Sequence, residues 1–150
     1  MNNKFIILLL CLIFALAKSP ALKAQTCTWT TFQAESGTRS SGSTIDTNHT
    51  GYTGSGFVNT ANATGSWFEI SVATTTAGAT NLQLRYANGT TADRPVSVSV
   101  NGTTAVASVS LPATGAWTTR SIKNLSVNLN AGNNAIRFTS LTSQGAPNID

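Results

Sequence analysis

Charge is scarce in this chain. Nine Lys and Arg residues and five Asp and Glu residues account for 9% of the 150 residues and give a formal net charge of +4. Three of the nine bases, Lys4, Lys18 and Lys23, lie within the first 24 residues, which leaves six bases against five acids, a net charge of +1, in the rest. Nucleic acids and anionic membrane surfaces select strongly basic partners. We therefore expect neither as a partner.

Cysteine and histidine are almost missing as well. Of the two cysteines, Cys11 lies in the N-terminal segment, so a chain without that segment keeps only Cys27 and forms no intrachain disulfide. Cys27 is either an unused tail thiol or the site of an intermolecular bridge. The single histidine, His49, stands in a Thr-, Asn- and Gly-rich stretch without a second ligand at zinc-site spacing, and we interpret it as a solvated loop residue.

The few acidic residues leave little for catalysis. Glycoside hydrolysis needs two carboxylates about 5–9 Å apart across one bond. Glu69 lies within an alternating segment on the side opposite its apolar residues, while Asp46 and Asp93 fall in separate loops. No serine has the G-x-S-x-G spacing of a nucleophile elbow. We expect no enzymatic activity, and a small hydrolase is the least supported alternative.

The one long apolar run is N-terminal. Residues 5–17 follow Lys4 and are followed by small residues up to Ala24, a layout that predicts a secretory signal peptide over residues 1–24. The run of about a dozen residues is shorter than the roughly 20 needed to cross a bilayer. Lipidation at Cys11 is the weaker alternative. We expect a secreted or periplasmic protein, free of the membrane after cleavage, with residues 25–150 as one domain.

Alternation of apolar and polar residues dominates the remaining sequence. In residues 95–111, Val96, Val98 and Val100 alternate with serines, and Asn101-Gly102, a favoured pair for a tight hairpin turn, precedes a second alternating run. Other strands are expected around Phe32 and in residues 56–58, 67–73, 81–87, 117–122, 126–129 and 134–141. Eight or nine short strands at this spacing predict an all-β fold, a jelly-roll β-sandwich of two antiparallel sheets.

One polar pair stands out near the start of the domain. In "TFQAES", residues 31–36, an amide and a carboxylate are two positions apart, at Gln33 and Glu35. If this stretch is a strand, both side chains point to the same face of the sheet.

Seven short motifs occur in a fixed order from about Thr31 to Asp150. They are "FQAES", "GYTGSGFV", "WFEISV", "LRYANGTTADRPVSVSVNG", "LPATGAWTT", "VNLNAGNNAIRF" and "PNID". Together they resemble the carbohydrate-binding modules of families 6 and 35. The resemblance implies a non-catalytic jelly roll that binds a polysaccharide or oligosaccharide and targets an attached or partner glycoside hydrolase or lyase. Family members normally continue for one more short strand, so we expect the C-terminal strand to be truncated.

The resemblance also implies a structural calcium ion (Ca²⁺) held by Gln33, Glu35 and Asp150. The chemistry is compatible, because Ca²⁺ takes six to eight oxygen ligands from carboxylates, amides and carbonyls. The alternative for Glu35 is a solvated carboxylate on an edge strand.

For sugar binding, the resemblance implies Phe57, Asn88, Trp117 and Asn148. Trp117 would stack on a sugar ring, while Asn88 and Asn148 would hydrogen-bond its hydroxyl groups. Two alternatives stay open: Trp117 as a core residue at the start of a strand, and Asn88 as a turn residue. Family members often carry a second tryptophan shortly after the first, where this sequence has no aromatic residue.

Arg94 has two interpretations. It either faces an acidic sugar such as a uronate, which the family 35 resemblance favours, or forms a surface ion pair with Asp93. At the level of the whole domain, the alternative to a sugar-binding module is a surface adhesion or structural β-sandwich that makes protein contacts without a sugar site.

Overall fold

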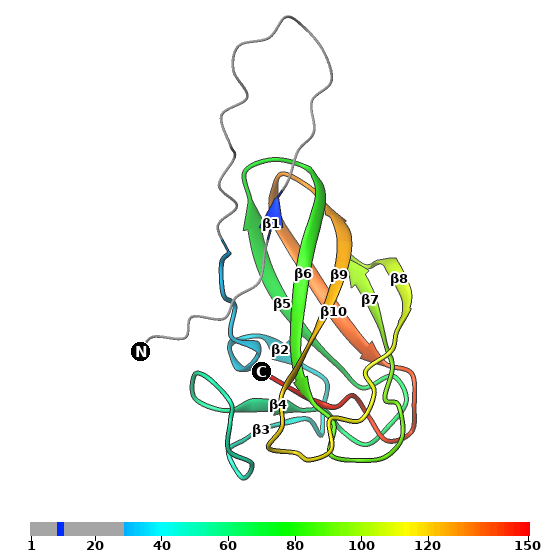
Figure 1. Ribbon diagram of the computed structural model, residues 1–150. Helices are drawn as coiled ribbons and strands as arrows, with labels where there is room; N and C mark the ends of the chain where they lie inside the picture. The colour runs from blue at the N-terminus through cyan, green and yellow to red at the C-terminus, as the bar shows by residue number, and fades with distance from the viewer. Residues whose placement is uncertain (1–8, 11–28) are drawn as a thin grey trace, which may run out of the picture.

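Antiparallel strands account for nearly all the regular structure of the residues that the computed structural model describes, 9–10 and 29–150 (Figure 1). Within these residues no helix is long and apolar enough to cross a membrane. Cys11, Cys27 and most of the predicted signal peptide lie outside the described part, so leader cleavage stays a prediction.

Two sheets pack face to face. One contains β1 (Leu9–Leu10), β3 (Thr44–Asp46), β4 (Phe57–Asn59), β6 (Gly78–Ala87), β9 (Ser121–Leu129) and β11 (Asn148–Ile149), with β6 at its centre. The other contains β2 (Thr38–Arg39), β5 (Trp67–Thr74), β7 (Val96–Val100), β8 (Thr103–Val109) and β10 (Gly132–Ser140), in the order β2-β5-β10-β7-β8. The predicted all-β jelly-roll sandwich is confirmed.

Alternation along the strands builds the core. In β7, Val96, Val98 and Val100 are buried between partly exposed serines, as their period of two predicts. The rings of Phe68 in β5 and Phe138 in β10 stack with their centroids 4.8 Å apart. The side chains that the two sheets turn toward each other therefore form one continuous apolar layer.

The predicted hairpin between β7 and β8 is confirmed. Asn101 and Gly102 have φ values of 51° and 82°, the left-handed conformation that a tight two-residue turn requires.

Two predicted strands are wrong. Residues 34–36 form a 3-10 turn, η1 (Ala34–Ser36), in place of a strand, so Gln33 and Glu35 do not share a sheet face. Residues 117–120 are loop, and β9 is one strand that begins at Ser121. In both places alternation over only a few residues is too short to outweigh hydrogen bonding within a turn.

The central strand of the first sheet, β6, has different pairing partners along its two edges. β9 pairs with the full length of β6 on one edge, while the other edge is shared by β11 near Ala87 and β1 near Thr80. An apolar hollow lined by Phe68, Leu82 and Phe138 opens beside this shared edge. The C-terminal strand expected beyond Asp150 stays a prediction.

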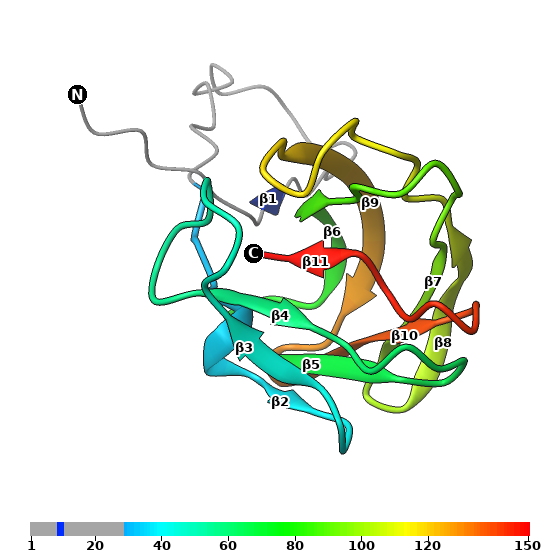
Figure 2. The ribbon, with the colours of Figure 1, turned by 90° about the horizontal axis from the view of Figure 1, so that it is seen from below.

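The loops that follow β4 and β6 and those that precede β4, β9 and β11 gather at one end of the sandwich, the end nearest the viewer in Figure 2. The candidate site lies among these loops.

Candidate functional site

An open hollow of about 440 Å³ lies at this end of the sandwich. We call it the loop-end hollow. It is lined by the loops after β3, β4, β6, β8 and β10 and by the strand ends of β4 and β11 beside them. Its lining residues are His49, Asn59, Asn62, Thr90, Arg94, Trp117, Ser143, Gln144 and Asn148. Amides and hydroxyls around a few rings and one cation provide hydrogen-bonding groups, without the paired carboxylates of a glycosidase.

Trp117 is the tryptophan of the loop-end hollow. It is half-buried in the loop between β8 and β9 and lies outside the apolar core. One side of its indole rests on Gly89, where an added Cβ would lie 2.5 Å from Trp117 Cγ. Gly89 therefore allows the ring to lie flat against the backbone while it lines the hollow. The interpretation of Trp117 as a core residue is wrong.

Asn148 lies at the base of the loop-end hollow. Its backbone pairs with Ala87 of β6, which fixes the position of the side chain. The residue is only 4% exposed, yet among the described residues its side-chain amide has no hydrogen-bond partner. Because an amide at such a site is stable only when it is solvated or paired, Asn148 is well placed to bind a ligand that enters the hollow.

Phe57 does not line the hollow. It is fully buried, with 0% of its surface exposed, and lies between Tyr52, His49 and Arg120. The prediction that its ring touches the sugar is contradicted by this burial. Phe57, which the family motif suggested as a sugar contact, instead packs beneath the site.

His49 is a second ring of the hollow, which its position in the sequence did not indicate. Its imidazole lies between Trp117 and Phe57, with centroid separations of 6.0 Å to each and interplanar angles of 18° and 23°. It lines the hollow and is not a freely solvated loop residue. No sequence spacing links residues 49 and 117, so only the fold could reveal this arrangement.

Asn88 is a turn residue, and its side chain has no capacity left for a sugar. Its amide nitrogen donates to the carbonyls of Ala92 (2.8 Å) and Leu111 (3.0 Å). Its amide oxygen accepts hydrogen bonds from the backbone and hydroxyl of Thr90. With 0% exposure, Asn88 cannot make the predicted contacts with a ligand. Its backbone also pairs with Thr114, which anchors the loop that carries Trp117.

We predict that Asn88→Ala lowers the free energy of unfolding by about 2 kcal/mol, because the buried carbonyl of Leu111 loses its partner, together with the more exposed carbonyl of Ala92 and hydroxyl of Thr90. Urea denaturation of the variant and the parent chain measures this. Lost glycan binding at unchanged stability would contradict the assignment.

Arg94 is a buried cation at the wall of the hollow. It is 4% exposed, its Nε donates to Gly145 O (3.1 Å), and one terminal nitrogen donates to Asn62 Oδ1 (3.3 Å). Its Cζ lies 5.5 Å from the ring centroid of Trp117. Burial lowers the pKa of this guanidinium from its usual value.

The ion pair predicted between Arg94 and Asp93 is not formed. Asp93 is exposed and accepts a hydrogen bond from the backbone N–H of Leu111 (2.7 Å), and the ion pairs found in the described residues involve other arginines. Arg94 therefore keeps a buried positive charge that no carboxylate of the described chain neutralises, an arrangement that favours an anionic ligand.

A second polar cluster joins the first and last segments of the domain. Glu35 Oε1 accepts from the backbone of Ser55 (2.8 Å), and Asp150 Oδ1 accepts from the backbone of Thr53 (2.7 Å). The hydroxyl of Thr53 lies 3.3 Å from Gln33 Oε1 and 3.2 Å from Asp150 Oδ1. The three residues predicted as calcium ligands thus converge on one loop, although η1 rather than a strand brings Gln33 and Glu35 together.

The donor set fits a hard cation. Glu35 Oε2 is buried and has no hydrogen-bond partner among the described residues. A Cβ at Gly54 would collide with Glu35 Oε1 and lie 2.8 Å from Gln33 Oε1. Only glycine at position 54 therefore lets the loop approach these two oxygens so closely. Two carboxylates and one amide are compatible with Ca²⁺. Asp150 also pairs with Arg85, which shares its charge. No three His, Cys, Asp or Glu side chains cluster in residues 9–10 and 29–150, so the amide and main-chain carbonyls would have to complete the site.

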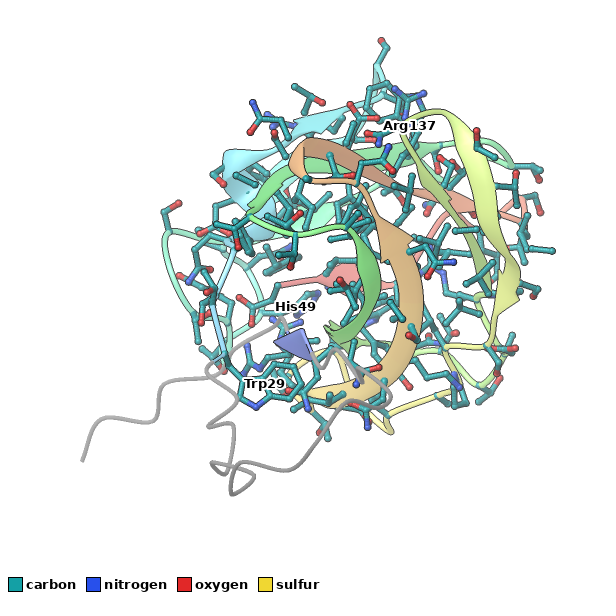
Figure 3. All side chains as sticks on the ribbon, turned by 90° about the horizontal axis from the view of Figure 1, so that it is seen from above. Trp29, His49 and Arg137 are labelled. Carbon is teal, nitrogen blue, oxygen red and sulfur yellow. The ribbon has the colours of Figure 1, made fainter. Side chains whose placement is uncertain are left out.

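Trp67 is not a second platform. The guanidinium of Arg137 covers its ring, with Cζ 3.9 Å from the centroid, and Arg137 Nε donates to Glu69 Oε2 (2.9 Å). Figure 3 shows Arg137 on the side of the molecule away from His49 and Trp29. Glu69, held in this pair, does not line the loop-end hollow.

A tryptophan ring beside amides that can hydrogen-bond is an arrangement suited to binding a small ligand with apolar and polar faces. The sequence profile described as "Carbohydrate binding module (family 6)" matches residues 33–150. This chain belongs to that family.

Known proteins agree with this assignment. Endo-1,4-beta-xylanase B of Cellvibrio japonicus is 46% identical over 108 residues, which are 71% of this chain and 18% of the xylanase. The native family 35 carbohydrate binding module from Clostridium thermocellum is 43% identical with a TM-score of 0.77, covering 79% of this chain and 91% of that one. Xyl-CBM35, solved with a glucuronic acid containing disaccharide, is 48% identical with a TM-score of 0.69, covering 71% and 78%. The matched modules are non-catalytic.

Proposed function

We propose that this chain is a secreted module that binds an acidic glycan in its loop-end hollow and brings an attached or partner glycan-degrading enzyme to that glycan. The observation that supports this best is the buried guanidinium of Arg94 beside Trp117, which has no carboxylate partner in the described chain. A uronate supplies both an apolar ring face for Trp117 and a carboxylate for Arg94. Xyl-CBM35, a similar protein, has been solved with a ligand of this class.

In this proposal each part of the hollow has one role. The indole of Trp117 stacks on the sugar ring, and the free amide of Asn148 hydrogen-bonds a hydroxyl group. Arg94 pairs with the carboxylate, while Asn62 and Gly145 hold the guanidinium in place. No step breaks a bond.

The calcium ion is proposed as a structural element. Gln33, Glu35 and Asp150 would hold it against the loop of residues 53–55, joining η1 to β11. When bound, the ion would neutralise carboxylates at the two ends of residues 25–150, which contain only one cysteine, Cys27.

The role of Arg94 is tested by Arg94→Gln. We predict that this change weakens binding of a glucuronic acid-containing disaccharide about tenfold, because a charge-assisted hydrogen bond is lost. Isothermal titration calorimetry measures it, with the methyl ester of the same disaccharide as the uncharged control. The variant and the parent should bind the ester alike. An equal loss of affinity for the disaccharide and for its methyl ester would show that Arg94 only supports the fold of the loop.

The competing function is a surface adhesion or structural domain. Affinity electrophoresis in gels loaded with xylan, mannan, pectin or β-glucan separates the two. A sugar-binding module is retarded in at least one gel, most strongly where the polymer carries uronates. Unchanged mobility in every gel would favour the adhesion domain.

A further inference from the structure

His49 occupies a position in the loop-end hollow that none of its family motifs assigns. Its imidazole is nearly parallel to the indole of Trp117, with an interplanar angle of 18°, and Phe57 supports it from the buried side. The nearly parallel rings of residues 49 and 117 come from two different loops. This pair provides a second ring in a sequence that has no second tryptophan after Trp117.

The nitrogens of the His49 ring are available to a ligand. The residue is half-buried and lines the hollow, and in the described part of the chain no side chain or backbone group hydrogen-bonds its ring. An imidazole can donate one hydrogen bond when neutral and two when charged.

The charged groups around His49 come from three other segments. Arg94 contacts the ring of Trp117 and Arg120 contacts the ring of Phe57, with Cζ 5.5 Å and 5.1 Å from the respective ring centroids. The acidic residue Asp46 of β3 pairs with Phe57 of β4, the residue on which His49 stacks. The carboxylate of Asp46 accepts a hydrogen bond from Asn59. The carboxylate of a bound ligand next to the ring would favour its charged form.

We propose that His49 is a sugar-contacting residue that, together with Arg94, recognises the carboxylate of a uronate, so that binding takes up a proton and strengthens as the pH falls. This inference rests on the proposed function, because it concerns the same hollow and the same ligand. The sign follows from linkage: a carboxylate next to the ring stabilises the charged imidazole in the complex, and the complex then holds more protons than the free protein.

The contribution of His49 to the pH dependence of binding can be measured separately. His49 is the only histidine, and histidine is the side chain whose ordinary charge change falls between about pH 5 and 8. A uronate carboxyl group, like other carboxyl groups, stays ionised across this range. Loss of the pH dependence in a His49 variant would therefore assign it to this ring.

The test measures binding of a glucuronic acid-containing disaccharide by calorimetry at pH 5.5 and pH 8, in buffers of different ionisation enthalpy. We expect the parent chain to bind about tenfold more tightly at pH 5.5 and to take up protons on binding. His49→Phe keeps a ring but no charge, so it should bind with one affinity at both pH values and without proton uptake. His49→Gln should do the same and should also bind the methyl ester less tightly, because the ring contact is lost.

The outcomes separate this inference from the proposed function. If the parent binds the disaccharide but His49→Phe keeps the same pH dependence and proton uptake, the inference about His49 is overturned and the glycan site stands. If the parent binds neither the disaccharide nor its ester at either pH, the proposed function itself fails. Circular dichroism checks whether each variant is folded, and the comparison of the parent with His49→Phe decides the inference even if His49→Gln unfolds.

Discussion

Trp117→Ala weakens glycan binding about 30- to 150-fold, which corresponds to about 2–3 kcal/mol for the loss of an aromatic anchor in a binding site. The reason is the exposed side of the indole, which lines the loop-end hollow while Gly89 supports the other side. No other tryptophan lines this hollow, so no neighbouring indole can replace it. Calorimetry or affinity electrophoresis with the glycan that retards the parent chain measures the change.

Trp67→Ala is the matched control. Trp67 is also a partly exposed tryptophan, but Arg137 covers its ring and it belongs to β5, outside the hollow. We expect its affinity to stay within about twofold of the parent, since it makes no ligand contact. If Trp117→Ala binds as well as Trp67→Ala, the sugar platform lies elsewhere.

We expect calcium to raise the melting temperature of the metal-stripped chain by about 10 °C at a concentration 100 times its Kd. A ligand that binds only the folded state at that concentration adds about 2.7 kcal/mol, and a domain of this size gains a few degrees per kcal/mol. The physical cause is the buried, unpaired Oε2 of Glu35 and the convergence of Gln33 and Asp150 on the same loop. Differential scanning calorimetry with and without calcium measures the shift.

Glu35→Gln is the variant that should lose most of this response, because it removes a carboxylate while keeping a side chain of similar size. Asp46→Asn is its control, since Asp46 pairs with Asn59 on β4 and lies apart from the cluster. The calcium assignment would be contradicted if the melting temperature of the parent chain did not change with calcium. It would also be contradicted if Glu35→Gln responded to calcium as strongly as the parent.

The fold could be predicted because its signal repeats along the chain. Long alternating runs such as residues 95–111 leave only one face apolar, and burial of that face determines the sandwich. Short segments carry too few alternations to decide. Residues 34–36 and 117–120 are therefore turns or loops, although their sequences allow a strand.

The site was only partly predictable for a different reason. Family motifs place a residue in a loop, but they do not say whether its side chain points into the hollow or beneath it. Trp117 and Asn148 line the hollow as expected, while Phe57 and Asn88 are buried under it and serve packing and turn formation. The role of His49 depends on its approach to a ring 68 positions later in the chain, which no local pattern reports.

For the polar cluster of Gln33, Glu35 and Asp150, the side chains were predicted to lie together, but the local backbone structure was not. Its members were identified from family motifs, and the structure brings them together through a 3-10 turn and the residue that follows β11 rather than along one strand. The chemistry of the donor atoms was predicted from the sequence, while the backbone that presents them was not.

The most direct test of the account is an NMR titration of the amide signals of the labelled chain with a glucuronic acid-containing disaccharide. The account predicts that the largest shifts are confined to the loop-end hollow, at His49, Arg94, Trp117 and Asn148 and their neighbours, with the ligand recovered intact afterwards. Shifts concentrated on the outer face of β5 and β10, no shifts at millimolar ligand, or cleavage of the disaccharide would contradict it.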